Sequence, residues 1–203
     1  KEGKIFIFRL KEHYQRLLDG CRIMRINLPY SLDELCQITV NIIERSGFSE
    51  DVYIRPLAYK SAERVANLNL RDLEDDFLVF AIPFGRYLSD TPLLCCTSSW
   101  RRIDDVMIPP RVKVSGLYVN SIMAKTDALA SGFDEAILLN QDGHVSEGSG
   151  ENIFIVKNGI LSTPGTQENV LPGITRDTII QLARTELSTE VVERTIDRSE
   201  LYL

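Results

Sequence analysis

Hydrophobic spacing constrains this chain most, because its period changes between helical and strand-like values along the sequence. From Leu10 to Met24 the apolar residues recur at a helical spacing, and Arg16 lies on this predicted helix. Ser31 and Glu34 have the spacing of a capping box, which predicts a second amphipathic helix that continues to Gly47. Two helices therefore dominate the start of the chain.

Strand-like segments surround these helices, at residues 4–8, 51–59 and 77–82. The third segment is so uniformly apolar that we expect it to be buried on both faces. The polar, turn-forming stretch RYLSDTP at residues 86–92 then breaks the pattern. These features predict an α+β first half and two domains, a small α/β domain at 1–88 and a larger domain at 89–203.

The second half mixes short strands with two further helices. A strand is predicted at 93–100 and a helix at 117–130, with Gly132 ending the helix in a left-handed conformation. Asn158-Gly159 is typical of a type I′ hairpin turn. Further strands are predicted at 135–139, 144–147, 152–156, 160–163 and 190–196. A helix is predicted at 173–186, with Ile174, Ile179, Ile180, Leu182 and Ala183 on its buried side.

Composition excludes several classes of function. The 203 residues are 44% hydrophobic and 26% charged, which is typical of a globular protein. A net charge of −6 argues against binding to nucleic acid or to an anionic membrane. No apolar run has the roughly twenty residues needed to span a bilayer, and no signal peptide opens the chain, so the cytoplasm is the expected location.

The cysteines and histidines do not form a metal-binding pattern. Two histidines, His13 and His144, are present, and no His/Cys/carboxylate cluster accompanies them, so no metal is expected. The cysteines show no paired spacing, and we expect reduced thiols in the core at Cys21, Cys36, Cys95 and Cys96. The chain starts without methionine and ends at the beginning of a predicted helix, which suggests part of a longer protein.

Lys113 lies in the segment IPPRVKVSGLYVNS, where Val112 and Val114 would point to one side of a strand and the lysine to the other. A solvated strand lysine is the ordinary interpretation of such a residue. The alternative is a lysine that forms a Schiff base, which requires a partly desolvated amine on a rigid backbone.

The segment HVSEGSGENIF places two acids, Glu147 and Glu151, around the glycine-containing turn 148–150. One interpretation is an ordinary turn with exposed acids. The other is a carboxylate that faces a pyridine nitrogen and keeps it protonated, which makes the ring an electron sink.

The segment ENVLPGITRD opens a predicted helix with Gly173, Ile174 and Thr175. Its free N–H groups and the Thr175 hydroxyl would favour an anion, although a capped helix without any ligand has the same pattern. Arg16 could supply a fixed cation for a phosphate, and the alternative is an ordinary surface arginine.

Taken together, these segments resemble the class IV, fold-type IV pyridoxal-phosphate aminotransferases, and most closely the branched-chain aminotransferases. The resemblance covers nearly the whole chain, in the family's order and at close to its spacing. It rests on EHYQRL, YIRP, SSWRR, IPPRVKVSGLYVNS, DEAILL, GHVSEGSGENIF and LPGITRDTII. It implies a small α/β domain and a larger pseudo-barrel domain that binds the cofactor.

The resemblance also implies that the chain is incomplete at both ends. The family's first strands, which donate a pocket tyrosine, would precede residue 1, and its Gly-Thr-Ala turn would follow residue 203. The stretch at 86–92 is shorter than the family's connection between domains.

Roles for individual residues follow from the resemblance. Lys113 would form the Schiff base with pyridoxal 5′-phosphate and later move the substrate proton, Glu147 would pair with the pyridine nitrogen, and Tyr118 would hydrogen-bond the ring hydroxyl. The phosphate would be held by Arg16, Ile174 and Thr175, within a cofactor-binding segment that includes Leu171 and Gly173. The substrate pocket would be lined by Tyr53, Arg55, Phe84 and Tyr87, with Arg55 meeting the side-chain carboxylate of glutamate.

The implied activity is exchange of an amino group between a branched-chain L-amino acid and 2-oxoglutarate, by a ping-pong route through pyridoxamine phosphate. The partners would be small amino acids and 2-oxo acids, and the working unit a homodimer or larger homo-oligomer. Related alternatives are a D-amino-acid transaminase, an (R)-amine transaminase and aminodeoxychorismate lyase, and a non-catalytic anion-binding protein is a further one. Tyr118 and the Gly-Glu-Asn at 150–152 favour the branched-chain group.

Overall fold

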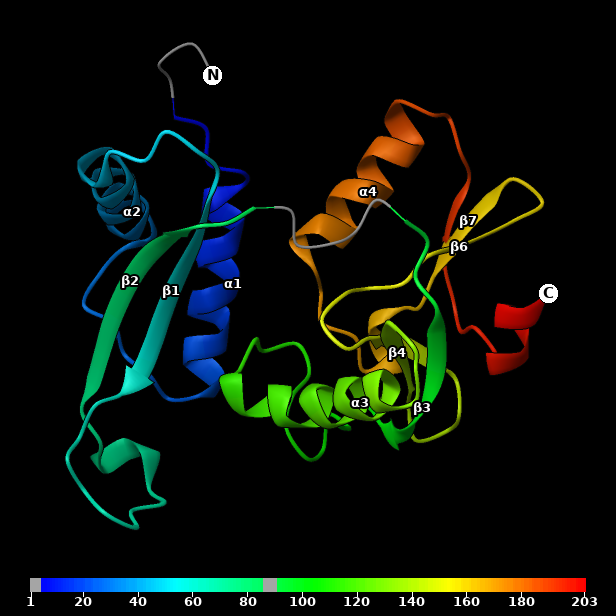
Figure 1. Cartoon of the computed structure of the whole chain (residues 1–203). Helices are drawn as coiled ribbons and strands as arrows, with labels where there is room; N and C mark the ends of the chain where they lie inside the picture. The colour runs from blue at the N-terminus through cyan, green and yellow to red at the C-terminus, as the bar shows by residue number, and fades with distance from the viewer. Residues whose placement is uncertain (1–4, 86–90) are drawn as a thin grey trace. The chain divides into compact units, whose positions relative to one another are not determined.

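The computed structural model describes residues 5–85 and 91–203. The chain divides into two compact units, Lys1–Asp90 and Thr91–Leu203 (Figure 1). Each unit has its own helices and its own sheet structure. The mixed α/β composition that the sequence predicts is present in both units.

The first unit combines two helices with a two-stranded antiparallel sheet. Helix α1 spans Leu10–Ile23 and α2 spans Leu32–Ser46. Strand β1, Val52–Lys60, pairs with β2, Asp75–Pro83, and a short 3-10 helix η1, Leu70–Asp72, lies between the two strands in the sequence. The two predicted helices and the strands at 51–59 and 77–82 are confirmed, with bounds that differ by one or two residues.

The start and end of α2 follow the local signals in the sequence. The Ser31 hydroxyl accepts from the Glu34 N–H at 3.3 Å, and the Glu34 carboxylate accepts from the Ser31 N–H at 2.7 Å, which completes the capping box. Gly47 ends the helix at φ 63°, where a Cβ would be strained. Between the helices, the hydroxyls of Tyr14 and Thr39 lie 2.5 Å apart, and both residues are buried.

The prediction that β2 is buried on both faces is wrong. Leu78, Phe80 and Ile82 are 38%, 40% and 46% exposed, and the residues between them are less exposed. The ring of Phe77 contacts Tyr14 of α1, so the helices cover the face that carries Phe77. Alternate residues of a strand point to opposite faces, and the apolar residues on the second face of β2 remain exposed in this chain.

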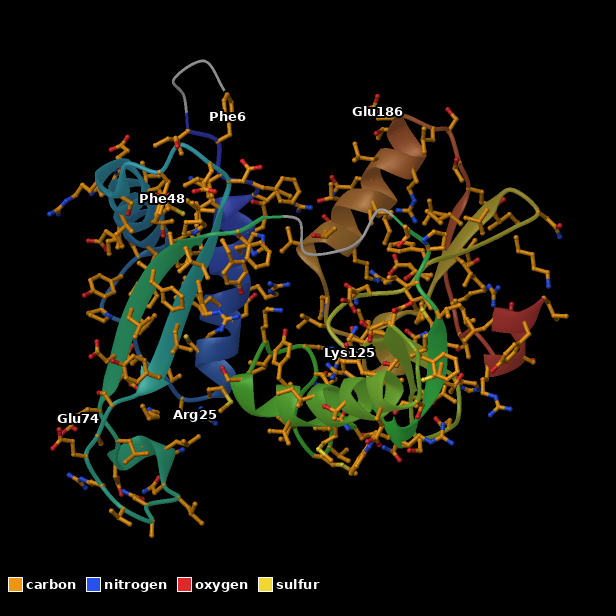
Figure 2. The ribbon with its side chains drawn as sticks, in the orientation of Figure 1. Phe6, Arg25, Phe48, Glu74, Lys125 and Glu186 are labelled. Carbon is orange, nitrogen blue, oxygen red and sulfur yellow. The ribbon has the colours of Figure 1, made fainter. Side chains whose placement is uncertain are left out.

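The predicted strand at 4–8 is also wrong for its described residues. Residues 5–7 have no regular structure, residue 8 begins a turn, and Arg9 adopts a left-handed conformation with φ 47° before α1 starts. Phe6 is 75% exposed at the outer end of the first unit (Figure 2). Alternation of apolar residues alone does not make a strand, because a strand needs a paired neighbour for its backbone hydrogen bonds.

The second unit contains two three-stranded sheets, with strand orders β3-β4-β5 and β6-β7-β8. The first sheet comprises β3, Cys95–Arg101, β4, Glu135–Leu139, and β5, Val145–Gly148. The second comprises β6, Ile155–Lys157, β7, Ile160–Thr163, and β8, Val191–Glu193. The helices are α3, Tyr118–Ala130, and α4, Ile174–Thr185, with 3-10 turns η2, Ser115–Leu117, η3, Thr166–Glu168, and η4, Arg198–Tyr202.

Helix α3 connects two parallel neighbours, β3 and β4, and packs against them (Figure 1). Parallel strands need such a crossover because the chain must return to the same end of the sheet. The buried contact is formed by small and aliphatic side chains, Ala124, Ala128, Ala136 and Leu138, with Cys96 against them. Alanines on the helix let it approach the sheet closely, which fixes the position where α3 begins.

Several local predictions for this unit are confirmed. Asn158 and Gly159 have φ 53° and 79°, as a type I′ turn requires, and Gly132 follows α3 at φ 83°. The prediction for α4 is partly wrong, because Ile179 and Leu182 are 37% and 50% exposed and the buried side includes Arg176 instead. The strands predicted at 152–156 and 190–196 are shorter than expected, with hydrogen-bonded pairing limited to three residues each.

The four cysteines are free thiols, but they are not all in the core. Cys21 is buried, Cys36 and Cys96 are half-buried, and Cys95 is exposed, which corrects the expectation of four core thiols. Within the described ranges, no helix is both long enough and apolar enough to cross a membrane.

We predict that Ser31→Ala lowers the free energy of unfolding by about 1 kcal/mol, because the Glu34 N–H loses its side-chain acceptor. Urea denaturation followed by circular dichroism measures this change. Ser31→Thr keeps the acceptor and should retain most of the stability. Equal destabilisation by both substitutions would contradict a capping role.

Candidate active site

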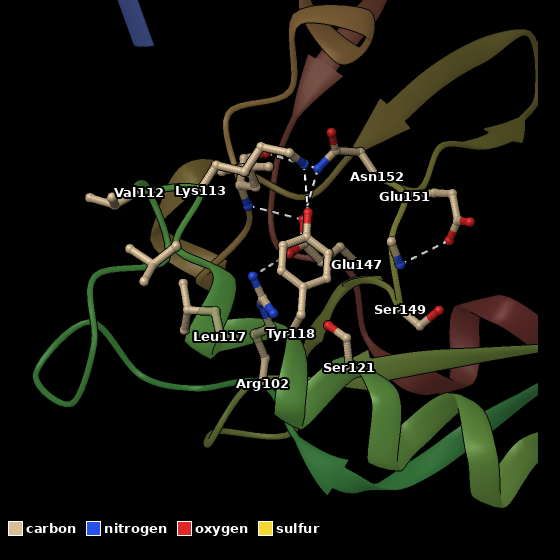
Figure 3. Close-up of a pocket in the computed structure, with 13 residues that line it drawn as sticks. Arg102, Val112, Lys113, Leu117, Tyr118, Ser121, Glu147, Ser149, Glu151 and Asn152 are labelled. Carbon is tan, nitrogen blue, oxygen red and sulfur yellow. Dashed lines mark hydrogen bonds and ion pairs between the residues drawn. The ribbon is translucent and has the colours of Figure 1, made fainter. Parts of the chain in front are cut away.

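A pocket in the second unit brings together residues from four segments of the chain (Figure 3). The segment before α3 supplies Lys113, and the first residue of α3 is Tyr118. Strand β5 supplies Glu147, and the segments that follow it supply Asn152 and Leu171. The rest of the lining consists of Arg102, Val112, Val114, Leu117, Ser121, Ser149, Gly150 and Glu151.

Lys113 lies in a turn and not on a strand, which corrects the sequence prediction. The Val112 N–H donates to the Pro109 carbonyl at 3.1 Å, and the Val114 N–H donates to the Val112 carbonyl at 2.9 Å. These short-range bonds replace the cross-strand bonds that a strand would make. Val112 and Leu117 are buried on either side, so the backbone is anchored while the lysine side chain stays exposed at the pocket.

The Lys113 amine donates a hydrogen bond to the Tyr118 hydroxyl at 2.5 Å. The same nitrogen is 5.2 Å from the centre of the tyrosine ring. A nitrogen so close to the hydroxyl oxygen and so far from the ring centre lies beyond the hydroxyl and not over the ring face. The 3-10 turn η2 and the start of α3 set this geometry, because they hold the lysine and the tyrosine on adjacent turns of the chain.

Glu147 is buried and is held by two hydrogen bonds and one ion pair. Its Oε2 accepts from the Asn152 side-chain amide at 2.9 Å and from the Leu171 N–H at 3.0 Å. Its Oε1 lies 2.7 Å from the guanidinium of Arg102, and both side chains are 7% exposed. A buried carboxylate held this way has one well-defined orientation.

Arg102 is a charged residue of the site that the sequence prediction missed. It follows β3 directly, and its Nε donates to the carbonyl of Asn169 at 3.2 Å. The available signal was weak, because SSWRR shows two adjacent arginines at the end of a predicted strand and does not show which one points inward. The structure buries Arg102 and leaves Arg101 exposed.

Burial raises the pKa of Glu147 to about 7. The positive charge of Arg102 opposes this rise most strongly, followed by the hydrogen bond from the Leu171 N–H and the charge of Lys113. A carboxyl group with such a pKa changes its protonation state readily near neutral pH.

The turn after Glu147 is closed by Glu151, which is half-buried. The Gly148 N–H donates to the Glu151 carbonyl at 2.7 Å, and the Gly150 N–H donates to the Glu151 carboxylate at 3.1 Å. Burial raises the pKa of the Glu151 carboxyl as well. Both acids of this turn are therefore withdrawn from solvent, which disagrees with an ordinary turn that carries exposed acids.

The segment before α4 also reaches the pocket. Gly173 is the N-cap of α4 and supplies no side-chain cap, and a Cβ built there would lie 2.1 Å from the Asn152 side-chain oxygen. Glycine at this position lets Asn152 occupy the place from which it donates to Glu147. Ile174 and Thr175 form the first turn of α4, with Ile174 half-buried and Thr175 exposed.

The predicted substrate residues that the structure describes form a separate cluster on the first unit. Both Nε and Nη2 of Arg55 lie 3.2 Å from the Tyr53 hydroxyl, to which they donate. The rings of Tyr53 and Phe84 have centres 5.2 Å apart. Arg16 lies half-buried on α1 of the same unit, and Tyr87 lies outside the described residues.

Comparison with known proteins identifies the family. The family model described as amino-transferase class IV matches residues 1–203. The chain is 50% identical over 203 residues to a probable branched-chain-amino-acid aminotransferase of Aquifex aeolicus, covering 100% of this chain and 65% of that protein. The chain belongs to the class IV aminotransferase family, as the resemblance of its motifs predicts.

Solved structures agree with this assignment. A branched-chain aminotransferase from Thermoproteus uzoniensis, solved with norvaline, matches with a TM-score of 0.92 at 45% identity, over 96% of this chain and 65% of that one. A branched-chain amino acid aminotransferase from Thermobaculum terrenum in its PLP form matches with a TM-score of 0.92 at 39% identity, over 100% of this chain and 66% of that one. The chain thus spans about two thirds of the length of these relatives.

We predict that Glu147 makes the stability of the cofactor-free protein depend on pH. Its pKa is higher in the folded state than its ordinary value of 4.5, so its contribution is fully present below pH 4.5 and is lost as the pH rises toward about 7. Relative to Glu147→Gln, the wild-type free energy of unfolding should fall by roughly 3 kcal/mol over this interval.

Urea denaturation at a series of pH values measures this difference. Where Glu147 is ionised the Gln variant also lacks the ion pair with Arg102, so the slope with pH, and not the stability at one pH, carries the information. Glu190→Gln, at an exposed position of the same unit, is the control and should keep the wild-type slope. Parallel pH profiles for wild type and Glu147→Gln would contradict the raised pKa.

Proposed function

We propose that this chain carries out transamination between a branched-chain L-amino acid and 2-oxoglutarate, with pyridoxal 5′-phosphate as the cofactor. The observation that carries this proposal is the pocket in which an accessible lysine amine, a tyrosine hydroxyl and a buried carboxylate meet. The names of the relatives support the substrate class, and norvaline and pyridoxal phosphate accompany two of them.

The residues of the pocket fit this cofactor chemically. An exposed primary amine can reach the aldehyde carbon of a ligand, and a hydroxyl stands next to it. The buried carboxylate of Glu147 offers an acceptor to a protonated ring nitrogen. Gly150 lines the pocket and adds no side-chain bulk to it.

Lys113 and Tyr118 would act together at one end of the pocket. Lys113 would hold the cofactor covalently through its amine and would carry the proton that leaves the substrate Cα. The hydrogen bond from the amine to the Tyr118 hydroxyl holds the lysine in the pocket instead of in bulk solvent. The same hydroxyl can donate its own proton to the oxygen of the cofactor ring.

Glu147 would act at the opposite end of the ring. When bound, pyridoxal phosphate supplies an electron sink that stabilises negative charge at the substrate Cα. Glu147 would hold a proton at the ring nitrogen through a charge-assisted hydrogen bond, and its two hydrogen bonds and its ion pair with Arg102 keep it oriented.

We further propose that Arg16 binds the cofactor phosphate together with the first turn of α4. Gly173, Ile174 and Thr175 lie at a helix N-terminus without a side-chain cap, where backbone N–H groups and the helix dipole favour an anion. Leu171 belongs to the same segment, and its N–H already holds Glu147. Guanidinium binds phosphate oxygens in pairs, which suits Arg16 for the role.

The substrate pocket would be lined by Tyr53, Arg55, Phe84 and Tyr87. Tyr53 and Phe84 supply aromatic surface for an aliphatic side chain, and Arg55 supplies a cation for the side-chain carboxylate of glutamate. The residues at 1–88 would form the small domain and those at 89–203 the larger pseudo-barrel domain that binds the cofactor. A homodimer or a larger homo-oligomer is the proposed working unit.

We predict that borohydride fixes pyridoxal phosphate to Lys113. Wild-type protein incubated with the cofactor and then reduced should gain the mass of one cofactor on the peptide that contains Lys113, because reduction makes the carbon–nitrogen bond permanent. Lys113→Ala should gain no such mass, while Lys157→Ala, at an exposed position of β6, should behave like wild type. Labelling that persists in Lys113→Ala would place the reactive amine elsewhere.

We also predict that Arg55 is needed for the reaction with glutamate but not for the reaction with leucine. In half-reactions followed by cofactor absorbance, Arg55→Met should lower kcat/KM for glutamate at least about tenfold more than for leucine, since leucine has no side-chain carboxylate. Arg71→Met, on η1 of the same unit, is the matched control. Equal losses for both substrates would remove Arg55 from glutamate recognition.

The same assay separates the alternative functions. Turnover of D-alanine or of an (R)-amine without turnover of leucine, isoleucine and valine would favour a D-amino-acid or (R)-amine transaminase. Bound cofactor without turnover of any amino donor would favour aminodeoxychorismate lyase. Failure to bind pyridoxal phosphate would leave a non-catalytic anion-binding protein as the better interpretation.

A further inference from the structure

The ion pair between Arg102 and Glu147 is buried on both sides and is fixed to the fold at several points. The Arg102 N–H donates to the Leu139 carbonyl at 2.8 Å, which ties the residue to the end of β4. Its guanidinium Nε donates to the Asn169 carbonyl at 3.2 Å, and its Nη2 lies 2.7 Å from Glu147 Oε1. The guanidinium therefore has a defined place from which it reaches the carboxylate.

The hydrogen bonds from the chain do not use every lone pair of the Glu147 carboxylate. An ionised carboxylate has about four lone-pair positions. Asn152 and Leu171 both donate to Oε2, and the Arg102 guanidinium is ion-paired with Oε1 at 2.7 Å. A lone pair of Oε1 can therefore accept from a donor within the pocket that Glu147 lines.

Charge explains why the residue paired with Oε1 is an arginine. Withdrawing a carboxylate from water favours its neutral form, and a neutral carboxyl group would offer a ring nitrogen a proton donor instead of an acceptor. The amide of Asn152 and the N–H of Leu171 orient the carboxylate but carry no net charge. Arg102 is the nearest positive charge to this group, and it has the largest opposing influence on the raised pKa of Glu147.

We propose that Arg102 is a positioning residue that keeps Glu147 ionised and aimed, so that Glu147 can accept the ring N–H of the cofactor. This inference rests on the proposed function. Arg102 acts on the ligand only through Glu147, so its effect is limited to one atom of the ligand, the ring nitrogen.

A purely structural arginine would behave differently. Arg102 also joins the end of β3 to the loop at Asn169, so its removal could loosen the whole pocket. Loosening would weaken every ligand that fits the pocket by a similar factor. Loss of an ionised Glu147 would instead weaken only ligands that present a ring N–H.

The test compares pyridoxal phosphate with its 1-deaza analogue, in which a C–H group replaces the ring nitrogen. Dissociation constants are measured by absorbance titration of the cofactor-free protein at pH 7.5. Wild type should bind pyridoxal phosphate more tightly than the analogue. Arg102→Met should reduce this preference by about tenfold, the usual effect of losing a hydrogen bond to a charged group.

Three further variants complete the experiment. Arg102→Lys keeps the charge and should retain the preference to within about threefold. Arg101→Met changes the exposed neighbour and should leave the preference unchanged. Arg102→Gln, which keeps a donor for the Asn169 carbonyl but no charge, replaces Arg102→Met in the comparison if the methionine variant does not fold.

The outcomes distinguish this inference from the proposed function. If wild type binds both ligands, and Arg102→Met or Arg102→Gln weakens both by the same factor, Arg102 has only a structural role. If wild type binds both ligands equally, Glu147 does not contact the ring nitrogen and the inference is wrong. If wild type binds neither ligand, the proposed function itself fails, and the inference fails with it.

Discussion

Burial of the Glu147 carboxylate is the constraint on which the pocket of the second unit depends. A carboxylate withdrawn from water is costly unless it is paired and hydrogen-bonded, and here its two donors and its ion-pair partner come from three separate segments of the chain. Arg102 follows β3, Asn152 lies beyond the glycine turn, and Leu171 precedes α4. Their convergence on one side chain fixes the relative positions of these segments, so the electrostatic requirement also shapes the site.

Lys113 shows a different arrangement, in which an anchored backbone carries an accessible side chain. Buried Val112 and Leu117 anchor its turn, while its side chain stays exposed and is held by Tyr118. The lysine amine is thus accessible at the pocket, whereas the Glu147 carboxylate is buried and fixed by its partners. The packing of α3 against β3 and β4 positions Tyr118, which is the first residue of that helix.

Local signals account for the elements that the sequence predicted well. The capping box at Ser31, the left-handed glycines after α2 and α3, and the Asn158-Gly159 turn depend on residues within a few positions of one another. Predictions failed where burial had to be inferred. The second face of β2 is exposed because only one face of that sheet meets the helices, and apolar composition alone carries no information about which face is covered.

The sequence by itself determined the order of the motifs, the family, and the residue types gathered near the candidate site, because these follow from side-chain chemistry and spacing along the chain. Tertiary structure alone decided that Arg102 and not Arg101 turns inward, that Glu147 is buried, and that Lys113 lies in a turn. The physical reason is that burial and pairing arise between segments distant in sequence, after strands and helices have packed. The motif was enough to predict Glu147, but only the folded chain shows that Arg102 lies beside it.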